Sequence, residues 1–316
     1  MSTSRFFKKQ VSRFGKTLRI TSQDYTYRNE AYNYLNKKNP LLKYVHTLNL
    51  ENVDVRDASA FGKVHTLNLA ETKVKDASAL GGVYDLDLRS TQVKHVSCLG
   101  NVHTLDLSFT DVKNVSALGK VHTLNLSYTS VIDVSALGNV HTLNLSGTSV
   151  TDVSALGKVH TLKLCCTYVV DVSALGNVNK LNLFSSQVVD VSMLGNVHTL
   201  NVGATEVKDV SALGKVHTLK LSNTPVSDVN ALGNVHTLDL SVTEVKDVSA
   251  LGNVHILNLT DTQVTDVSAL GKVHTLHLGG NKITSFRKLK HVRFLHVNKS
   301  QAKHARRLKH VKVIVN

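Results

Sequence analysis

The sequence is poor in the residues that usually line a small-molecule pocket or staple a secreted domain. It has no tryptophan, two prolines and three cysteines in 316 residues. Ligand pockets depend on aromatic walls, so this composition argues against an enzyme, and we expect no cofactor and no metal. Cys98, Cys165 and Cys166 cannot form a disulfide framework, which favours a reducing, intracellular compartment.

Long apolar runs are missing as well. No stretch approaches the ~18 consecutive apolar residues of a membrane-spanning helix. The opening residues, MSTSRFFKKQ, lack the apolar segment of a secretory signal. Hydrophobic residues still make up 42% of the chain, which is enough for a large core. We therefore expect an ordered protein with no membrane span.

What the chain has in abundance is repetition. From Val45 almost to the end, one 19-residue unit recurs without an insertion, V-H-T-L-x-L-S-x-T-x-V-x-D-V-S-A-L-G-(N/K). We number its positions 1 to 19, as in residues 121–139. Apolar residues occupy positions 1, 4, 6, 11, 14 and 17, and the alternation at positions 4 to 6 predicts a short strand with one buried face. Nineteen residues leave no room for an α-helix, so the return side is expected to be extended or to form a 3₁₀ turn.

The unit resembles the leucine-rich repeat, L-x-x-L-x-L-x-x-N/C-x-L, with valine in the first slot and threonine in the asparagine slot. The segment V-x-D-V-S-A-L-G-N is similar to the internalin repeat, shortened by three residues. The 19-residue form also resembles leucine-rich-repeat proteins of Marseillevirus-group giant viruses, which would place the chain in host cytoplasm or a virion. The resemblance covers about 270 residues. It implies a solenoid with a parallel sheet on its concave face that serves as a non-enzymatic protein-binding scaffold. Because coils without a helix have similar spacing on both faces, we expect the solenoid to have low curvature.

The repeats divide the chain into three parts. Residues 1–44 form a basic N-terminal segment and cap, in which 23–38 suit a short amphipathic helix and Leu18 and Ile20 a capping strand. Residues 45–291 hold thirteen regular repeats, and 292–316 a divergent basic repeat that ends in an apolar strand at 311–315. A bare edge strand invites pairing with a second chain, so a homodimer through this strand is a further expectation.

Two rows of side chains look like sites at first sight. Position 2 is histidine in eleven units and position 13 is aspartate in ten. A zinc site needs ligands that converge, whereas a straight row points its side chains in parallel. We interpret both rows as architecture: mostly neutral imidazoles, and carboxylates that cap the next turn. The threonine of position 9 is expected to bond backbone groups between coils, and the glycine of position 18 to permit a turn.

Partner binding should use positions that the fold leaves free, namely 3, 5, 7, 8 and 10. Most units carry small polar residues there, but the middle of the array carries aromatic and lysine side chains, which are typical of interfaces. Random drift on a tolerant surface would give the same pattern. The partner-binding candidates are Phe109, Tyr128, Lys163, Tyr168, Lys180 and Phe184.

The net charge of +14 is concentrated at the two ends. Residues 1–44 hold ten Lys and Arg with two acids, and residues 279–316 hold eleven with none. Such patches attract phosphates, so nucleic-acid or anionic-surface binding is the alternative function, and a solubilising cap is the plainer interpretation. The anion-binding candidates are Arg287, Lys288, Lys290, Arg293, Lys303, Arg306, Arg307 and Lys309.

Overall fold

The computed structural model describes residues 17–19, 42, 45–283, 285–308 and 310–315. They belong to two compact units, residues 1–150 and 151–316, which are treated separately below. The helix expected at 23–38, together with Ile20 and Lys309, lies outside the described residues. Within the described part of the chain, no helix is long and apolar enough to cross a membrane.

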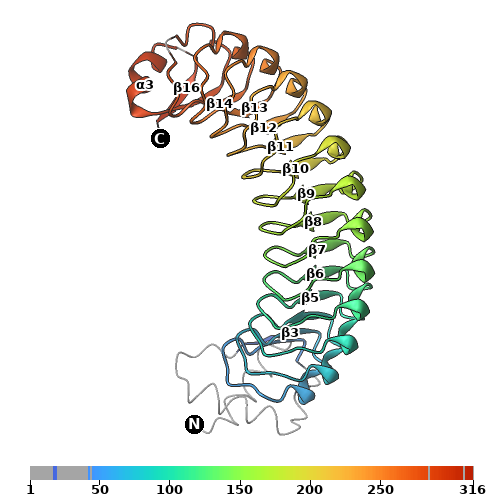
Figure 1. Ribbon diagram of the computed structural model, residues 1–316. Coiled ribbons are helices and arrows are strands. Elements are labelled where there is room, and N and C mark those ends of the chain that lie inside the picture. The colour runs from blue at the N-terminus through green and yellow to red at the C-terminus, as the bar shows by residue number, and fades with distance from the viewer. Residues whose placement is uncertain (1–16, 20–41, 43–44, 284, 309, 316) are drawn as a thin grey trace, which may run out of the picture. The chain divides into compact units, whose positions relative to one another are not determined.

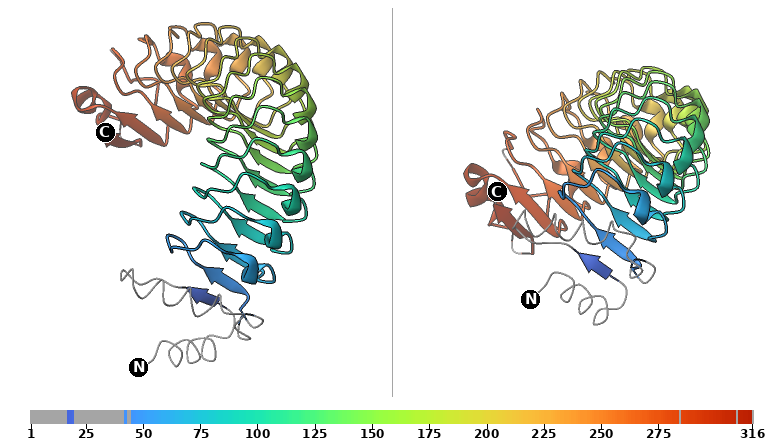
Figure 2. Two further views of the ribbon diagram at one scale, coloured as in Figure 1. Left: turned by 60° about the horizontal axis from the view of Figure 1, so that its bottom comes forward. Right: turned by 90° about the horizontal axis from the view of Figure 1, so that it is seen from below.

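Each 19-residue repeat from residue 45 to 272 forms one coil, with a short strand on one side and a 3₁₀ turn on the other (Figure 1). The strands of a unit run parallel and pair with their neighbours in chain order, and the 3₁₀ turns stack along the opposite side (Figure 2). This is a leucine-rich-repeat solenoid with a parallel sheet and almost no α-helix, as the sequence predicts. The 3₁₀ turn arises because the N–H of position 17 donates to the carbonyl of position 14, as from Leu137 to Val134 at 2.9 Å.

Among the described residues of the first unit, seven strands and five 3₁₀ turns are assigned. Leu18 pairs with Leu48, so the capping strand expected there forms. The later strands keep the 19-residue register, as Leu105 with Leu124. The elements are β1 Thr17–Arg19, β2 Thr47–Asn49, η2 Ser59–Phe61, β3 Thr66–Asn68, η3 Ser78–Leu80, β4 Asp85–Asp87, η4 Ser97–Leu99, β5 Thr104–Asp106, η5 Ser116–Leu118, β6 Thr123–Asn125, η6 Ser135–Leu137 and β7 Thr142–Asn144.

In the second unit, the part of the chain that the structure describes forms nine strands, seven 3₁₀ turns and one α-helix. The elements are η7 Ser154–Leu156, β8 Thr161–Lys163, η8 Ser173–Leu175, β9 Lys180–Asn182, η9 Ser192–Leu194, β10 Thr199–Asn201, η10 Ser211–Leu213, β11 Thr218–Lys220, η11 Asn230–Leu232, β12 Thr237–Asp239, η12 Ser249–Leu251, β13 Ile256–Asn258, η13 Ser268–Leu270, β14 Thr275–His277, β15 Phe294–Val297, α3 Lys299–Ala305 and β16 Lys312–Val315. Phe294 pairs with Lys312, which is 18 residues away, so the last coil is one residue shorter than the others.

The core is built from the apolar positions that the periodicity picks out. In the coil of residues 121–139, Val121, Leu124, Leu126, Val131 and Leu137 are fully buried, and Val134 is nearly so. The same six positions are buried in the coils on either side. Since each coil is one layer thick, these side chains pack mainly on the layers before and after them, and the coils stabilise one another.

Aspartate at position 13 caps the 3₁₀ turn, as expected. Asp133 Oδ1 accepts a hydrogen bond of 2.9 Å from the backbone N–H of Ser135, and Asn114 does the same for Ser116 at 3.0 Å. The acceptor stands two residues before the donor, with the buried Val134 between them, so the motif is an Asx turn leading into the 3₁₀ turn. The bond lowers the pKa of carboxyls in this row, as at Asp152, chiefly because the charged form accepts the N–H of Ser154.

Two expectations about the coil are wrong in detail. The threonine of position 9 bonds within its own coil: Thr129 Oγ1 donates to the carbonyl of Leu126 at 2.6 Å. The glycine of position 18 has ordinary right-handed backbone angles, with φ of −63° at Gly119. A Cβ there would lie 2.3 Å from the carbonyl oxygen of Ala136 in the next coil. Position 18 is therefore glycine because adjacent coils touch through their backbones.

Candidate functional site

The loop that follows each strand has an unusual backbone. Position 8 adopts a positive φ in nearly every coil, close to +55°, although only two of these residues are glycine. The left-handed conformation costs a residue with a Cβ about 1–2 kcal/mol. The interstrand ladder enforces it, since the N–H of Tyr128 donates to the carbonyl of Ser146 in the next coil at 2.8 Å. Position 8 is thus held outward at the rim of the sheet.

Phe109 and Tyr128 occupy this position in neighbouring coils of the first unit. Their rings stack with centroids 4.7 Å apart and planes 11° apart. Both remain more than half exposed, at 58% and 55%. A Cβ on Gly147, the position-8 residue of the following coil, would lie 2.6 Å from the ring of Tyr128. The Tyr128 ring therefore rests on the Gly147 backbone, and we call Phe109 and Tyr128 the aromatic pair.

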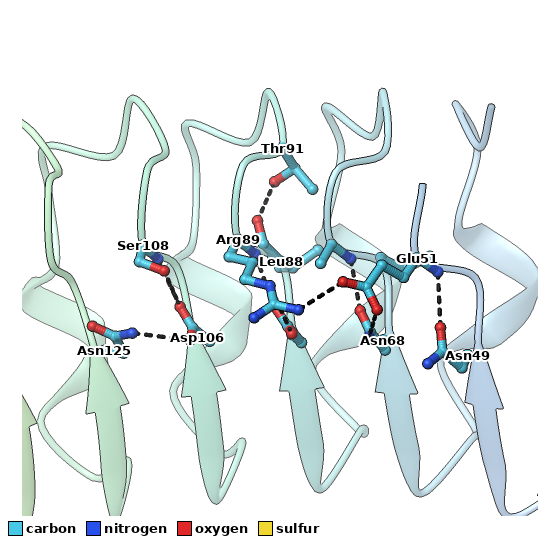
Figure 3. A network of polar contacts seen from close by, with 12 residues as sticks. Asn49, Glu51, Asn68, Leu88, Arg89, Thr91, Asp106, Ser108 and Asn125 are labelled. Atoms are coloured by element: carbon cyan, nitrogen blue, oxygen red, sulfur yellow. Dashed lines mark hydrogen bonds and ion pairs between the residues drawn. The ribbon is translucent and has the colours of Figure 1, made fainter. Parts of the chain in front are cut away.

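An acidic network lies on the strand side of the same unit (Figure 3). Arg89 Nη2 is 2.8 Å from Glu51 Oε1, two coils away, and Arg89 Nε is 3.4 Å from Asp87 Oδ2. Asn68 Nδ2 donates to the other Glu51 oxygen at 3.3 Å. Burial raises the pKa of Asp87, although the backbone N–H and the positive charge of Arg89 both act to lower it. One arginine therefore serves two acids here.

The network continues toward the aromatic pair through position 5. Asp106 pairs with Asp87 across strands β4 and β5, and its Oδ2 accepts from Asn125 Nδ2 at 2.9 Å (Figure 3). Asp106 Oδ1 also accepts the backbone N–H of Ser108 at 2.8 Å, directly before Phe109. The aromatic pair consequently stands next to a strand face with surplus negative charge.

Position 5 is less free than the sequence suggests. Its asparagine and aspartate side chains accept the backbone N–H of position 7, as Asn125 Oδ1 does from Ser127 at 3.1 Å. This interaction shapes the loop of each such coil, so most of these residues are structural. Lysine cannot accept a hydrogen bond, and Lys163 and Lys220, which replace asparagine in β8 and β11, are exposed.

The remaining partner-binding candidates lie in the second unit. Lys163 and Lys180 are on the adjacent strands β8 and β9, and both side chains are exposed. Phe184 follows β9, and its carbonyl accepts the N–H of Cys166 at 3.0 Å in the coil before. These residues therefore lie on two neighbouring coils. Tyr168 is exposed later in the β8 loop, beyond the buried Thr167.

Other exposed apolar residues escaped the sequence argument. Tyr84 at position 2 and Val242 at position 8 are two of them. Four more occupy positions 12 and 16 on the return side of the coils, where most units carry polar residues or alanine: Ile132, Val170, Val189 and Met193. Comparing each slot with its own consensus would have found them. Ile132 lies in the coil of Tyr128, and the other three belong to two consecutive coils of the second unit.

The histidines of position 2 form stacked columns. In the first unit, the rings of His103, His122 and His141 follow one another with centroids 4.6 and 4.7 Å apart. Tyr84 continues the stack at 4.5 Å from His103. Desolvation and the neighbouring imidazoles lower the pKa of His122. Among the described residues, no group of three or more His, Cys, Asp or Glu side chains is arranged to hold a metal ion.

The basic candidates near the C-terminus separate into two groups. Arg287, Lys288, Lys290 and Arg307 line one hollow of about 750 Å³ at the end of the second unit. The others that the structure describes are not part of its lining. Arg293 lies over the ring of Phe294 at 5.5 Å, and Lys303 and Arg306 belong to α3 and its C-terminal end.

Of the comparisons with known proteins, the one with solved structures bears on the fold. No family model matches, and no curated protein matches. The chain is similar to an internalin from Listeria monocytogenes, with 19% identity over 87% of this chain and 88% of that one and a TM-score of 0.70. It is also similar to a leucine-rich-repeat protein of Leptospira interrogans, with 16% identity over 96% and 91% and a TM-score of 0.71. A plant peptide hormone receptor in complex with RGF2 matches at 14% identity over 86% and 55%, with a TM-score of 0.59. At these identities the likeness establishes the leucine-rich-repeat fold.

Proposed function

We propose that this protein is a non-enzymatic scaffold that binds another protein through the aromatic pair of its first unit. The observation that carries the proposal is the construction of the pair. Phe109 and Tyr128 stack on each other and on Gly147, and each sits in a left-handed backbone conformation that favours glycine. Exposed aromatic side chains that are already ordered lose little conformational entropy on binding.

The strand face beside the pair indicates the chemistry of the partner. Asp87 and Asp106 pair across adjacent strands, and among the described side chains Arg89 is the one base in the network they share with Glu51. A segment with basic side chains next to apolar or aromatic ones would complement both surfaces. A peptide ligand is consistent with the fold, because the plant receptor that this chain resembles is a peptide hormone receptor.

Selection from a random peptide library tests the proposal. Peptides selected on the full chain should combine basic and aromatic residues. Phe109→Ser with Tyr128→Ser should weaken their binding by more than tenfold, the order of a binding hot spot. Serine already fills position 8 at Ser90 and Ser185, so the coil tolerates it. The matched control is Val242→Ser, an exposed apolar residue in the same slot of the other unit.

The proposal fails if peptides selected on the wild type bind the aromatic double variant equally well. It also fails if the library yields no peptide that prefers this chain to an unrelated protein. Loss of binding in Val242→Ser alone would place the site in the second unit.

We also propose that the protein works in a reducing compartment inside a cell and that it is of viral origin. Three cysteines without disulfide bonds support a reducing compartment inside a cell, and the uninterrupted 19-residue unit supports the resemblance to Marseillevirus-group proteins. Nucleic-acid binding through the basic ends has less support, because only four of the seven described candidates, Arg287, Lys288, Lys290 and Arg307, line one hollow, and Arg293, Lys303 and Arg306 lie outside it. Mass spectrometry of the protein from its native source, with free cysteines blocked before lysis, tests the reducing compartment. We expect all three cysteines to be blocked, and a disulfide bond would contradict the proposal.

A further inference from the structure

The hollow at the end of the second unit interrupts the repeat pattern in a specific way. Position 13 is Ser285 where ten coils carry aspartate, and its hydroxyl accepts the N–H of Arg287 at 3.4 Å. The turn thus keeps its acceptor but loses the carboxylate. Positions 15, 16 and 18 change at the same time, from serine, alanine and glycine to Arg287, Lys288 and Lys290.

The ending of the array explains why these residues fit. Elsewhere a side chain at position 18 would strike the next coil, as a Cβ on Gly271 would lie 2.6 Å from the carbonyl oxygen of Lys288. After Lys290 the chain forms the helix α3 in place of another 3₁₀ turn, and this helix packs on β15 and β16. The residues around its C-terminal end, His304, Arg307 and Leu308, form the second wall of the hollow.

The charge of this hollow is unbalanced. Four permanently basic side chains line it, with His291 and His304 beside them. The last Asp or Glu of the sequence is Asp266, and its carboxylate caps the turn of the previous coil through the N–H of Ser268 at 2.8 Å. No described carboxylate forms an ion pair with Arg287, Lys288, Lys290 or Arg307 within 4.0 Å. These positive charges attract anions to the hollow, and a bound anion would reduce their mutual repulsion.

We propose that this hollow is a binding site for a small ligand with several phosphate groups, and we call it the phosphate hollow. A volume of about 750 Å³ is in the range of small-molecule sites and much larger than one phosphate needs. Arginine and lysine arriving from two segments match several phosphates at once, with arginine bidentate and lysine as a point charge. The hollow is open on one side, and its four lysine and arginine side chains converge on one place from two segments, which favours a compact polyphosphate over an extended polynucleotide. This inference is independent of the aromatic pair, which lies in the other unit.

Titration calorimetry with inorganic tripolyphosphate, on the full chain at about 0.15 M salt, where the Debye length is about 8 Å, tests the site. The informative variant is Lys288→Ala with Lys290→Gly, because each change restores the residue that other coils carry. The charge-matched control is Lys303→Ala with Arg306→Ala, which removes two positive charges outside the lining. We expect saturable binding, weakened about tenfold or more by the first variant, since one lost charged hydrogen bond has that effect. The control should weaken binding by no more than about threefold, because exposed charges at a distance are screened.

A second variant guards against a folding defect. Ser285→Asp restores the usual cap and adds one carboxylate inside the phosphate hollow, so it should also reduce the affinity while circular dichroism and the melting temperature stay unchanged. Three results would overturn the proposal: no saturable binding of tripolyphosphate, equal losses in the two charge-matched variants, or tighter binding of a single-stranded oligonucleotide than of tripolyphosphate. The last result would assign the basic residues to an extended nucleic-acid surface.

Discussion

The ring of Tyr128 lies on the backbone of Gly147. A Cβ on Gly147 would be 2.6 Å from both Cδ1 and Cε1 of that ring, and the φ of Gly147 is +69°. Alanine there would suffer twice, from the left-handed backbone and from the ring. The relationship links an exposed aromatic side chain to a residue one coil away.

Replacing Gly147 with alanine should therefore destabilise the protein. We expect a loss of about 1–2 kcal/mol in the free energy of unfolding from the backbone alone, measured by urea denaturation. In a Tyr128→Ala background the loss should be smaller, because the contact with the ring is gone. Gly279→Ala is the control: the nearest side-chain atom to its Cβ would be 3.4 Å away, an ordinary contact. Additive effects of Gly147→Ala and Tyr128→Ala would contradict the packing.

The position-13 caps make a second prediction. Asp152→Ala should lower the melting temperature at pH 7, because the N–H of Ser154 loses its acceptor at 2.9 Å. Asp152→Asn should lower it less, since Asn114 performs the same role in another coil. The carboxyl has a lowered pKa in the folded state, so its contribution is present above the ordinary value of 3.8 and is lost as the pH falls through the lowered one. A melting temperature equally sensitive to pH below 4 in Asp152→Ala and the wild type would count against the cap.

The stacked histidines predict a separate acid response. His122 and His236 have lowered pKa values in the folded protein, first from desolvation and then from the neighbouring imidazoles. Below the ordinary pKa of 6.5 the unfolded chain binds more protons than the folded one, so stability falls from about that pH downward. Thermal unfolding between pH 7.5 and 5 measures the effect.

Replacing stacked histidines with tyrosine tests this acid response, because tyrosine can stack but does not gain a proton between pH 7.5 and 5. Tyr84 already occupies the stack between His65 and His103, at 4.8 and 4.5 Å. His122→Tyr and His141→Tyr together should keep the stacking and reduce the slope of melting temperature against pH. His310→Tyr, an exposed histidine in the final segment, should leave the slope unchanged. An unaltered slope in the double variant would contradict the prediction.

We predict that the protein self-associates through its last strand, β16. Among the described strands, β16 pairs with β15 alone, and Val313 and Val315 are only half-buried. Its free edge can accept a strand from a second molecule, so light scattering should show a mass that rises toward a dimer with concentration. Ile314→Lys should reduce this association, whereas Ile256→Lys, the same change inside the sheet, should not. A constant monomer mass at high concentration would disprove it.

The fold could be predicted from the sequence because a single 19-residue repeat determines the coil and how coils stack. Six apolar positions, repeated without insertion, define a coil that is stable only in a stack, and the capping role of aspartate follows from its place before V-S-A-L. The roles of Thr129 and Gly119 were predicted less well. A hydroxyl can bond within or between coils, and a glycine can serve a turn or a close approach, so only coordinates distinguish the two.

The candidate sites were predicted unevenly, for a physical reason. Phe109 and Tyr128 stand out as departures from a small polar slot, but nothing in the sequence shows that position 8 is left-handed, since most residues there have a side chain. The phosphate hollow depends on two segments, 285–291 and 304–308, that meet only because α3 replaces the next turn. A charge run in sequence does not show which of its members converge.

The backbone contact at position 18 has a consequence for how such a chain can change. Because Gly119 meets Ala136 in the same way that Gly214 meets Ala231, every regular coil presents the same two surfaces to its neighbours. A deletion of residues 216–234 would join two coils that already fit, and a duplication would do so as well. The number of coils can therefore change without disturbing the contacts between neighbouring coils, although each coil adds its own interface to the stability. Recombination between repeats can alter how far the aromatic pair lies from the chain's end without redesigning a single contact in the core.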